Sequence, residues 1–263
     1  MENSILFKNI NVSFTDSGKG KAIVFLHGFL EDKSIWDDFS NQLSSKYRVI
    51  TVDLLGHGKT DCLSYVHTME EMAEAVSFVL KKLKIRKFFL VGHSLGGYVS
   101  MAIAEKFPDN IKGLCMFHSS ARGDSPEKQK DRDRAIKVVK QNKNLFINEA
   151  VPNLFNTKNY PYLEEIDKIK KIALATSLQG IVAALEGMKI RMDREIILNF
   201  APYHVFYIIG KEDNILPFES LIEQAGLPKK GSYLLLENVG HVGFMEAKVK
   251  SLFALNSFFA KKQ

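Results

Sequence analysis

The sequence contains few cysteines and no long apolar run, and these absences exclude several classes of protein. Only 2 of its 263 residues are cysteine, Cys62 and Cys115, and they do not form a CxxC pair. Neither a disulfide framework nor a thiolate zinc site is therefore expected. No apolar run approaches the roughly 20 residues that a spanning helix needs, and the first residues lack the regions of a secretory signal. These absences predict a cytoplasmic protein with no membrane partner.

The charge pattern also argues against nucleic acid as a partner. The formal net charge is +6, but the lysines are spread over predicted helices and no basic run is interleaved with aromatic residues. A solvated basic surface is more consistent with this pattern than a nucleic-acid site. Hydrophobic residues are 46% and charged residues 25%, the usual balance of a globular protein. We expect a small-molecule partner and leave the oligomeric state open.

Short apolar runs alternate with helical patterns along the chain. Runs of Val, Ile, Leu and Phe without alternation are typical of parallel strands covered on both faces. The runs are residues 22–27, 49–53, 88–92, 113–118, 204–210 and 232–236. Between two of them, residues 68–83 carry one apolar stripe at helical spacing and begin with a capping box, Thr68 and Glu71. The alternation predicts an α/β fold with a doubly wound, mostly parallel sheet.

Two segments depart from this alternation. Residues 5–14 predict an additional antiparallel edge strand or hairpin. Residues 122–199 contain no good strand and only helical patterns, such as 125–141 and 164–188. We interpret residues 122–199 as a helical lid inserted into a core made of residues 1–121 and 200–263.

A nucleophile elbow is the clearest chemical motif. Residues 92–97 read GHSLGG, a G-x-S-x-G pattern that follows a predicted strand and precedes a predicted helix. Glycines are needed there because side chains at Gly92 and Gly96 would collide with the neighbouring strand and helix. The helix that begins behind Ser94 directs its amide groups and positive end toward a developing anion. The pattern predicts Ser94 as a catalytic nucleophile.

A serine nucleophile requires a base, and the base requires a carboxylate. His241 follows the last predicted strand, in a loop at the carboxyl edge of the sheet, and is the predicted base. Asp213 follows the preceding strand and completes the chain order serine, acid, histidine that is expected of an α/β-hydrolase. Asp124, which follows an earlier strand, is the alternative acid.

Together these motifs resemble the α/β-hydrolase fold superfamily, in particular its lid-bearing esterases and meta-cleavage-product hydrolases. The resemblance rests on residues 27–30 (HGFL), residues 53–60 (DLLGHGKT), the elbow, and the loops of Asp213 and His241. It implies an oxyanion hole formed by the backbone amides of Phe29 and Leu95. Such amides stabilise a transition state more than a ground state.

The resemblance extends less clearly to substrate-binding residues. Residues 187–193 are similar to a family segment whose arginine faces the pocket, so Arg191 is a candidate carboxylate clamp. Met192 replaces the proline that often follows this arginine, and the alternative is an ion pair with Asp193 or another lid acid. His118, at the end of a strand, is a second candidate substrate contact or a buried structural histidine.

No cofactor or metal ion is expected. The sequence contains no HExxH motif and no GxGxxG after the first strand. We therefore predict a carboxylesterase-like serine hydrolase for a small or medium, partly apolar ester or thioester. Two alternatives are a carbon–carbon bond hydrolase or menaquinone-pathway-type lyase with the same triad, and a non-catalytic ligand receptor on the same fold.

Overall fold

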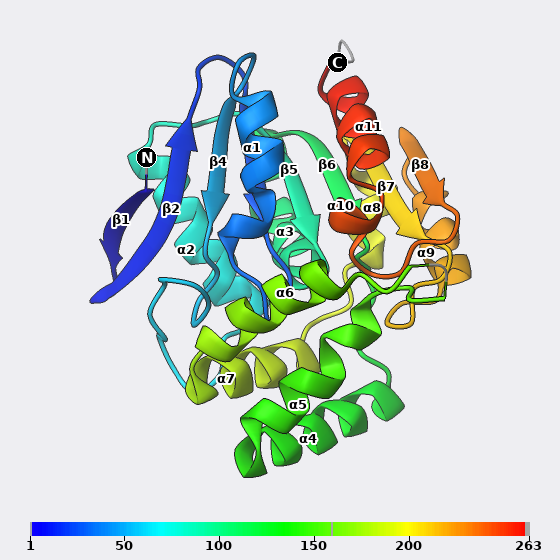
Figure 1. Cartoon of the computed structure of the whole chain (residues 1–263). Helices are drawn as coiled ribbons and strands as arrows, with labels where there is room; N and C mark the ends of the chain where they lie inside the picture. Colours follow the sequence, from blue (N-terminus) through cyan, green and yellow to red (C-terminus); the bar gives the residue numbers. More distant parts are fainter. Residues whose placement is uncertain (1, 159, 261–263) are drawn as a thin grey trace.

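One eight-stranded sheet organises the chain (Figure 1). The computed structural model describes residues 2–158 and 160–260. The strand order is β1-β2-β4-β3-β5-β6-β7-β8. The strands are β1 (Glu2–Phe7), β2 (Ile10–Ser17), β3 (Ala22–Leu26), β4 (Arg48–Val52), β5 (Phe88–His93), β6 (Ile111–Phe117), β7 (His204–Gly210) and β8 (Gly231–Leu236). Each predicted strand is present, and the predicted α/β fold class is confirmed.

The first two strands form the predicted antiparallel edge. β1 pairs with β2 around Phe7 and Ile10, and β2 runs antiparallel to β4. All the other neighbouring pairs, from β4 to β8, are parallel. Parallel strands bring their carboxyl ends to the same edge of the sheet, where ligands bind in this architecture.

Helices cover both faces of the sheet, as the continuous apolar strands require. In Figure 1, α1 and α11 lie in front of the sheet, and α2 and α3 lie behind it. The ring of Phe89 on β5 contacts Phe259 of α11, with 5.3 Å between centroids. The helices of the core are α1 (Asp37–Leu43), α2 (Met69–Lys82), α3 (Leu95–Lys106), α9 (Phe218–Ala225), α10 (Gly243–Glu246) and α11 (Lys248–Ala260), with short 3₁₀ turns η1 (Lys33–Trp36) and η2 (Pro108–Asn110).

The capping box of α2 forms as predicted. The Thr68 hydroxyl oxygen accepts from the Glu71 N–H at 3.1 Å, and the Glu71 carboxylate accepts from the Thr68 N–H at 3.2 Å. These bonds satisfy amide groups that a helix start leaves unpaired. The helix ends at Leu83, followed by Lys84 in a left-handed conformation (φ 55°).

A helical insertion lies between β6 and β7 and covers the carboxyl ends of the strands (Figure 1). Residues 164–188, predicted as one helical pattern, form two helices in the structure. The backbone of Thr176 is extended, and the Ser177 side chain accepts from the Gly180 N–H to cap the second helix. Arg194, which precedes α8, pairs with Glu105 and Glu70 of the core. The insertion contains α4 (Pro126–Gln141), α5 (Lys143–Ala150), η3 (Pro152–Leu154), α6 (Leu163–Ala175), α7 (Leu178–Lys189) and α8 (Glu195–Phe200).

Within residues 2–158 and 160–260, no helix combines the length and the apolar character that crossing a membrane requires.

Candidate active site

Ser94 lies at the tight turn between β5 and α3. Its backbone has a positive φ of 47°, which is uncommon for a residue with a side chain and is stabilised by the surrounding structure. The Ser94 N–H donates to the Phe117 carbonyl at 3.0 Å, and the Ser119 hydroxyl donates to the Ser94 carbonyl at 2.7 Å. Bonds to the neighbouring strand therefore hold the turn in its strained conformation.

The glycines of the elbow are required by space. A Cβ at Gly92 would lie 2.3 Å from the carbonyl oxygen of Gly96. A Cβ at Gly96 would lie 2.5 Å from the carbonyl oxygen of Leu26 on β3. Both contacts are with backbone that cannot easily move, so the helix approaches the sheet only where no side chain intervenes.

The three predicted catalytic side chains form one hydrogen-bonded chain. The Ser94 Oγ lies 2.9 Å from His241 Nε2, and His241 Nδ1 lies 2.7 Å from Asp213 Oδ2. The other oxygen of Asp213 accepts from the Ile215 and Leu216 amides at 2.8 and 3.0 Å. The carboxylate is thus fixed at both oxygens and can orient the imidazole.

The protonation states follow from this geometry. Burial alone would raise the pKa of Asp213, but the attraction of His241, the largest opposing cause, and its hydrogen bond to the carboxylate help to outweigh burial and lower it. Asp213 is therefore ionised and accepts the Nδ1–H of His241. That tautomer leaves Nε2 of His241 as an acceptor for the hydroxyl of Ser94.

His118, the predicted substrate contact, lies behind Asp213 and is fully buried. Its Nδ1 accepts from the Gly210 N–H at 3.2 Å, and burial lowers its pKa to about 4, so the ring is neutral. It does not line the cavity beside Ser94. This position favours a structural role beside the triad acid rather than contact with a substrate.

Phe29 and Leu95 are the residues whose backbone amides are the predicted oxyanion donors. Phe29 directly follows Gly28 in the loop after β3, and Leu95 is the first residue of α3. Among the described residues, no acceptor is hydrogen-bonded to either amide. Both N–H groups therefore lack a protein acceptor among the described residues, as an oxyanion donor requires.

Sequence reasoning missed a buried ion pair beneath the site. The Glu31 Oε2 accepts from the Gly28 N–H at 2.6 Å and lies 2.9 Å from His93 Nδ1. The His93 Nε2 donates to the His241 carbonyl at 2.8 Å. Both ring nitrogens face acceptors, so His93 is doubly protonated. Glu31 directly after the apolar Phe29 and Leu30, in the predicted oxyanion loop, is the signal that could have indicated the pair.

This pair shifts both pKa values. Burial disfavours the charged form of each group, but the mutual attraction is larger; it raises the pKa of His93 and lowers that of Glu31. The pair connects the oxyanion loop, the residue before the nucleophile and the backbone of the base. We interpret it as a brace that sets the distance between these parts.

Asp124 and Arg191 form a separate cluster in the lid. Asp124 contacts Arg191 Nη1 at 2.5 Å and Arg132 Nε at 3.1 Å, and no contact joins it to His241. The geometry therefore favours Asp213 over Asp124 as the triad acid. Arg191 also lies 4.0 Å over the ring of Tyr98 and donates to the Arg122 carbonyl at 3.0 Å. Its acid partner is Asp124, not Asp193.

One group of side chains has the composition of a metal site. Ligand atoms of His118, Asp213 and His241 lie within 4.8 Å of one another. However, Nδ1 of His118 accepts from Gly210, and Nδ1 of His241 carries the proton shared with Asp213. The triad explains this cluster without a metal ion.

A cavity of about 220 Å³ opens beside Ser94 and His241. The oxyanion loop contributes Phe29, and the lid contributes the apolar side chains Phe146, Leu185 and Met188. Lid charges, including Lys128 and Arg132, also line it. The site therefore combines an apolar wall with a charged rim.

Sequence comparisons identify relatives of this chain. A family model for the alpha/beta hydrolase fold matches residues 21–158. The probable lysophospholipase BODYGUARD 1 of Arabidopsis thaliana is 36% identical over 122 residues, which cover 44% of this chain and 26% of that protein. The chain thus spans about a quarter of the length of that relative.

Solved structures resemble the chain over nearly its whole length. A thermophilic esterase from Thermogutta terrifontis superposes with a TM-score of 0.91 at 29% identity, covering 98% of each chain. The enol-lactonase from Burkholderia xenovorans LB400 also has a TM-score of 0.91, at 21% identity, covering 98% of this chain and 100% of its own. The enol-lactonase supports the fold alone.

Proposed function

Since the chain belongs to the α/β-hydrolase fold family, we propose that it is a serine hydrolase acting through an acyl-enzyme on a small or medium, partly apolar ester or thioester. The hydrogen-bonded chain from Ser94 through His241 to Asp213, with distances of 2.9 and 2.7 Å, is the observation that carries the proposal. The likeness to an esterase at 29% identity supports it.

The first half of the reaction acylates Ser94. Its Oγ attacks the carbonyl carbon while His241 Nε2 takes the hydroxyl proton, and Asp213 stabilises the resulting imidazolium. The amides of Phe29 and Leu95 bind the oxyanion. The tetrahedral intermediate then collapses, and the leaving alkoxide or thiolate takes the proton from His241.

The second half releases the acid. A water molecule gives a proton to His241 Nε2 and attacks the acyl carbon, and the same amides bind the second oxyanion. Collapse breaks the bond to Ser94 Oγ, which takes its proton back from His241. The chain's own residues supply each proton transfer.

The cavity supports the proposed substrate class. It has a volume of about 220 Å³ and adjoins a cavity of about 430 Å³ that shares Tyr98, Lys128 and Ile215 with it, which suits a small or medium substrate. Phe146, Leu185 and Met188 favour apolar acyl groups, because burying such surface stabilises binding by about 25 cal/mol per Å².

The test combines a covalent probe with a substrate series. We expect a fluorophosphonate to form one adduct, on Ser94, and p-nitrophenyl acetate and butyrate to be cleaved faster than the dodecanoate. Ser94→Ala should abolish labelling and lower turnover by about 10⁴-fold or more, because triad members act as a unit. Ser45→Ala, at an exposed position, is the control for labelling at another serine hydroxyl.

Other outcomes would redirect the proposal. Labelling of Ser94 with negligible turnover of every ester would favour carbon–carbon bond hydrolysis or elimination by the same triad. If neither labelling nor turnover is observed, the result would favour a ligand receptor. Labelling at another residue, with turnover unchanged in Ser94→Ala, would contradict the nucleophile itself.

A further inference from the structure

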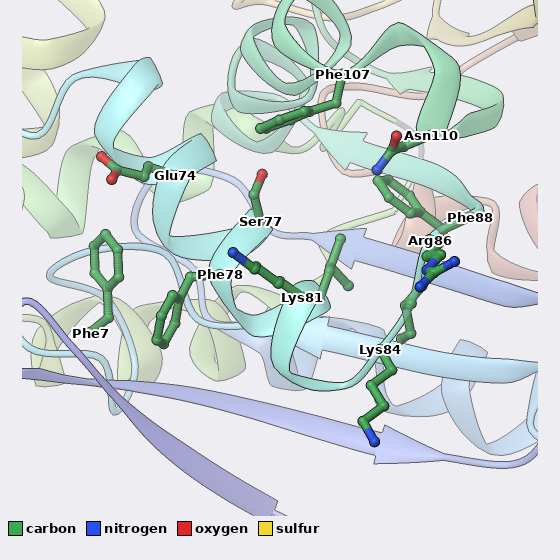
Figure 2. A pocket seen from close by; sticks show the side chains of 12 residues that line it. Phe7, Glu74, Ser77, Phe78, Lys81, Lys84, Arg86, Phe88, Phe107 and Asn110 are labelled. Carbon is green, nitrogen blue, oxygen red and sulfur yellow. The ribbon is translucent and has the colours of Figure 1, made fainter.

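Another cavity lies beside helix α2 (Figure 2). It has a volume of about 590 Å³ and shares no lining residue with the cavity beside Ser94. We refer to it as the α2 groove. Its 12 lining residues come from β1, α2, the loop to β5, the start of β5, and the segment after α3.

Four phenylalanines line the α2 groove, of which Phe7 and Phe88 are nearly buried, with 4% and 2% of their surface exposed. Phe7 and Phe78 contact each other with 5.3 Å between ring centroids, and Phe88 and Phe107 contribute two more rings. Ser77 points from α2 toward Phe107 in Figure 2. Its hydroxyl is buried and has no hydrogen-bond partner among the described residues, an arrangement that costs free energy unless a ligand oxygen satisfies it.

The unpaired charges that line the α2 groove are positive. Lys81, Lys84 and Arg86 are exposed, and within the described part of the chain they form no ion pair. The one acid in the lining, Glu74, is neutralised by Lys8 at 2.8 Å. An apolar surface bordered by three unpaired cations is complementary to a ligand with an apolar chain and an anionic head.

The size of the α2 groove favours a small molecule over a protein. A standard protein interface uses about 20–30 residues on each side, whereas 12 residues line this cavity. Its volume lies within the range of about 300–1,000 Å³ that is typical of small-molecule pockets. We propose that the α2 groove binds a fatty acid, with its alkyl chain on the aromatic rings and its carboxylate among Lys81, Lys84 and Arg86.

Photo-crosslinking of the full chain tests this proposal. The probe is dodecanoate with a diazirine at the alkyl end, used below its micelle concentration, and peptide mass spectrometry locates the adducts. We expect adducts on peptides that contain residues 74–88 or Phe107, removed by competition with unlabelled dodecanoate but not with dodecyltrimethylammonium. Adducts confined to the lid and the catalytic cavity would overturn the proposal.

Variants test charge and volume separately. Lys81→Glu with Arg86→Glu should weaken dodecanoate binding at least about tenfold through charge reversal, and Ser77→Phe should do so by filling the cavity. Lys229→Glu with Lys230→Glu, and Ser257→Phe, are matched controls at exposed positions outside the groove.

The variants are compared at equal folded fraction, judged by circular dichroism and unchanged ester turnover. Unchanged labelling in both groove variants would overturn the proposal. Competition by dodecyltrimethylammonium that equals the competition by unlabelled dodecanoate would also overturn it. The same holds if an acidic peptide without an alkyl chain competes as well as unlabelled dodecanoate does.

Discussion

The carboxylate of Asp213 determines which nitrogen of His241 faces the nucleophile. Its Oδ2 lies 2.7 Å from Nδ1, and two backbone amides hold the opposite oxygen. An amide side chain in its place could donate to Nδ1 and so stabilise the wrong tautomer. In the proposed mechanism, reaction at Ser94 therefore depends on Asp213, which acts through His241.

We expect Asp213→Asn to lower ester turnover by about 10⁴-fold, the size of loss found when a triad base is misoriented. Asp124→Asn should lower turnover less than about tenfold, since Asp124 contacts Arg191 and Arg132 instead of His241. Steady-state kinetics with p-nitrophenyl butyrate measures both. Reversed results would place the triad acid after the earlier strand.

The Glu31–His93 pair predicts a pH-dependent stability. Because the pair raises the pKa of His93, its stabilisation is fully present below the ordinary histidine pKa of about 6.5. It is lost as the pH rises through the raised pKa of the folded state. Glu31→Gln should therefore lower the Tm most near pH 6, and the difference from wild type should shrink toward pH 9.

Differential scanning fluorimetry across this pH range measures the difference. The exposed Glu74→Gln variant is the control for removal of an acid. A Tm difference that stays constant from pH 6 to pH 9 would show that His93 is not charged in the folded protein.

At the scale of elements, the lid is held together by charges that periodicity does not indicate. Arg191 follows α7, stacks on Tyr98 of α3 and pairs with Asp124, which precedes α4. A single guanidinium therefore connects both ends of the lid to the core. Its planar geometry allows stacking and pairing at the same time, which a lysine cannot reproduce.

We predict that Arg191→Lys lowers the Tm by several degrees, because a buried acid loses part of its pairing. Turnover of neutral esters and of carboxylate-bearing esters should fall by the same factor, since the variant loosens the lid. Arg134→Lys, at an exposed position on α4, is the control. A selective loss of the carboxylate-bearing esters, with an unchanged Tm, would instead favour the substrate clamp.

At the scale of the whole molecule, α7 joins the lid to the core at two glycines. A Cβ at Gly180 would lie 2.2 Å from the Gly56 carbonyl oxygen, and a Cβ at Gly187 would lie 1.7 Å from that of His67. The His67 N–H donates to the Ala183 carbonyl at 3.0 Å. Backbone thus packs on backbone, which sets how closely the lid approaches the catalytic cavity.

Gly187→Ala should displace α7 and destabilise the protein by about 1–3 kcal/mol, the usual cost of overpacking. It should also raise the KM for esters, because Leu185 and Met188 of α7 line the catalytic cavity. Gly226→Ala is the control, since its Cβ would meet no atom closer than 3.3 Å. Urea unfolding and ester kinetics check both effects, and a wild-type KM would contradict the predicted displacement.

Local patterns in the sequence determined most of the architecture. Strand positions, the α2 capping box and the elbow depend on neighbours within a few residues, and these are legible in the chain itself. The motifs also indicated which side chains to place together at the carboxyl edge. The structure brings Ser94, Asp213 and His241 within hydrogen-bonding distance there.

Only the tertiary structure decided the pairings between distant residues. Glu31 meets His93 across 62 positions of the chain, and Arg191 takes Asp124 in place of the nearby Asp193. The division of residues 164–188 into two helices, by contrast, follows from a local contact, the cap that Ser177 places on the Gly180 N–H. Periodicity records which face of an element is buried, whereas the partner of a buried charge depends on which other elements the fold brings against that face.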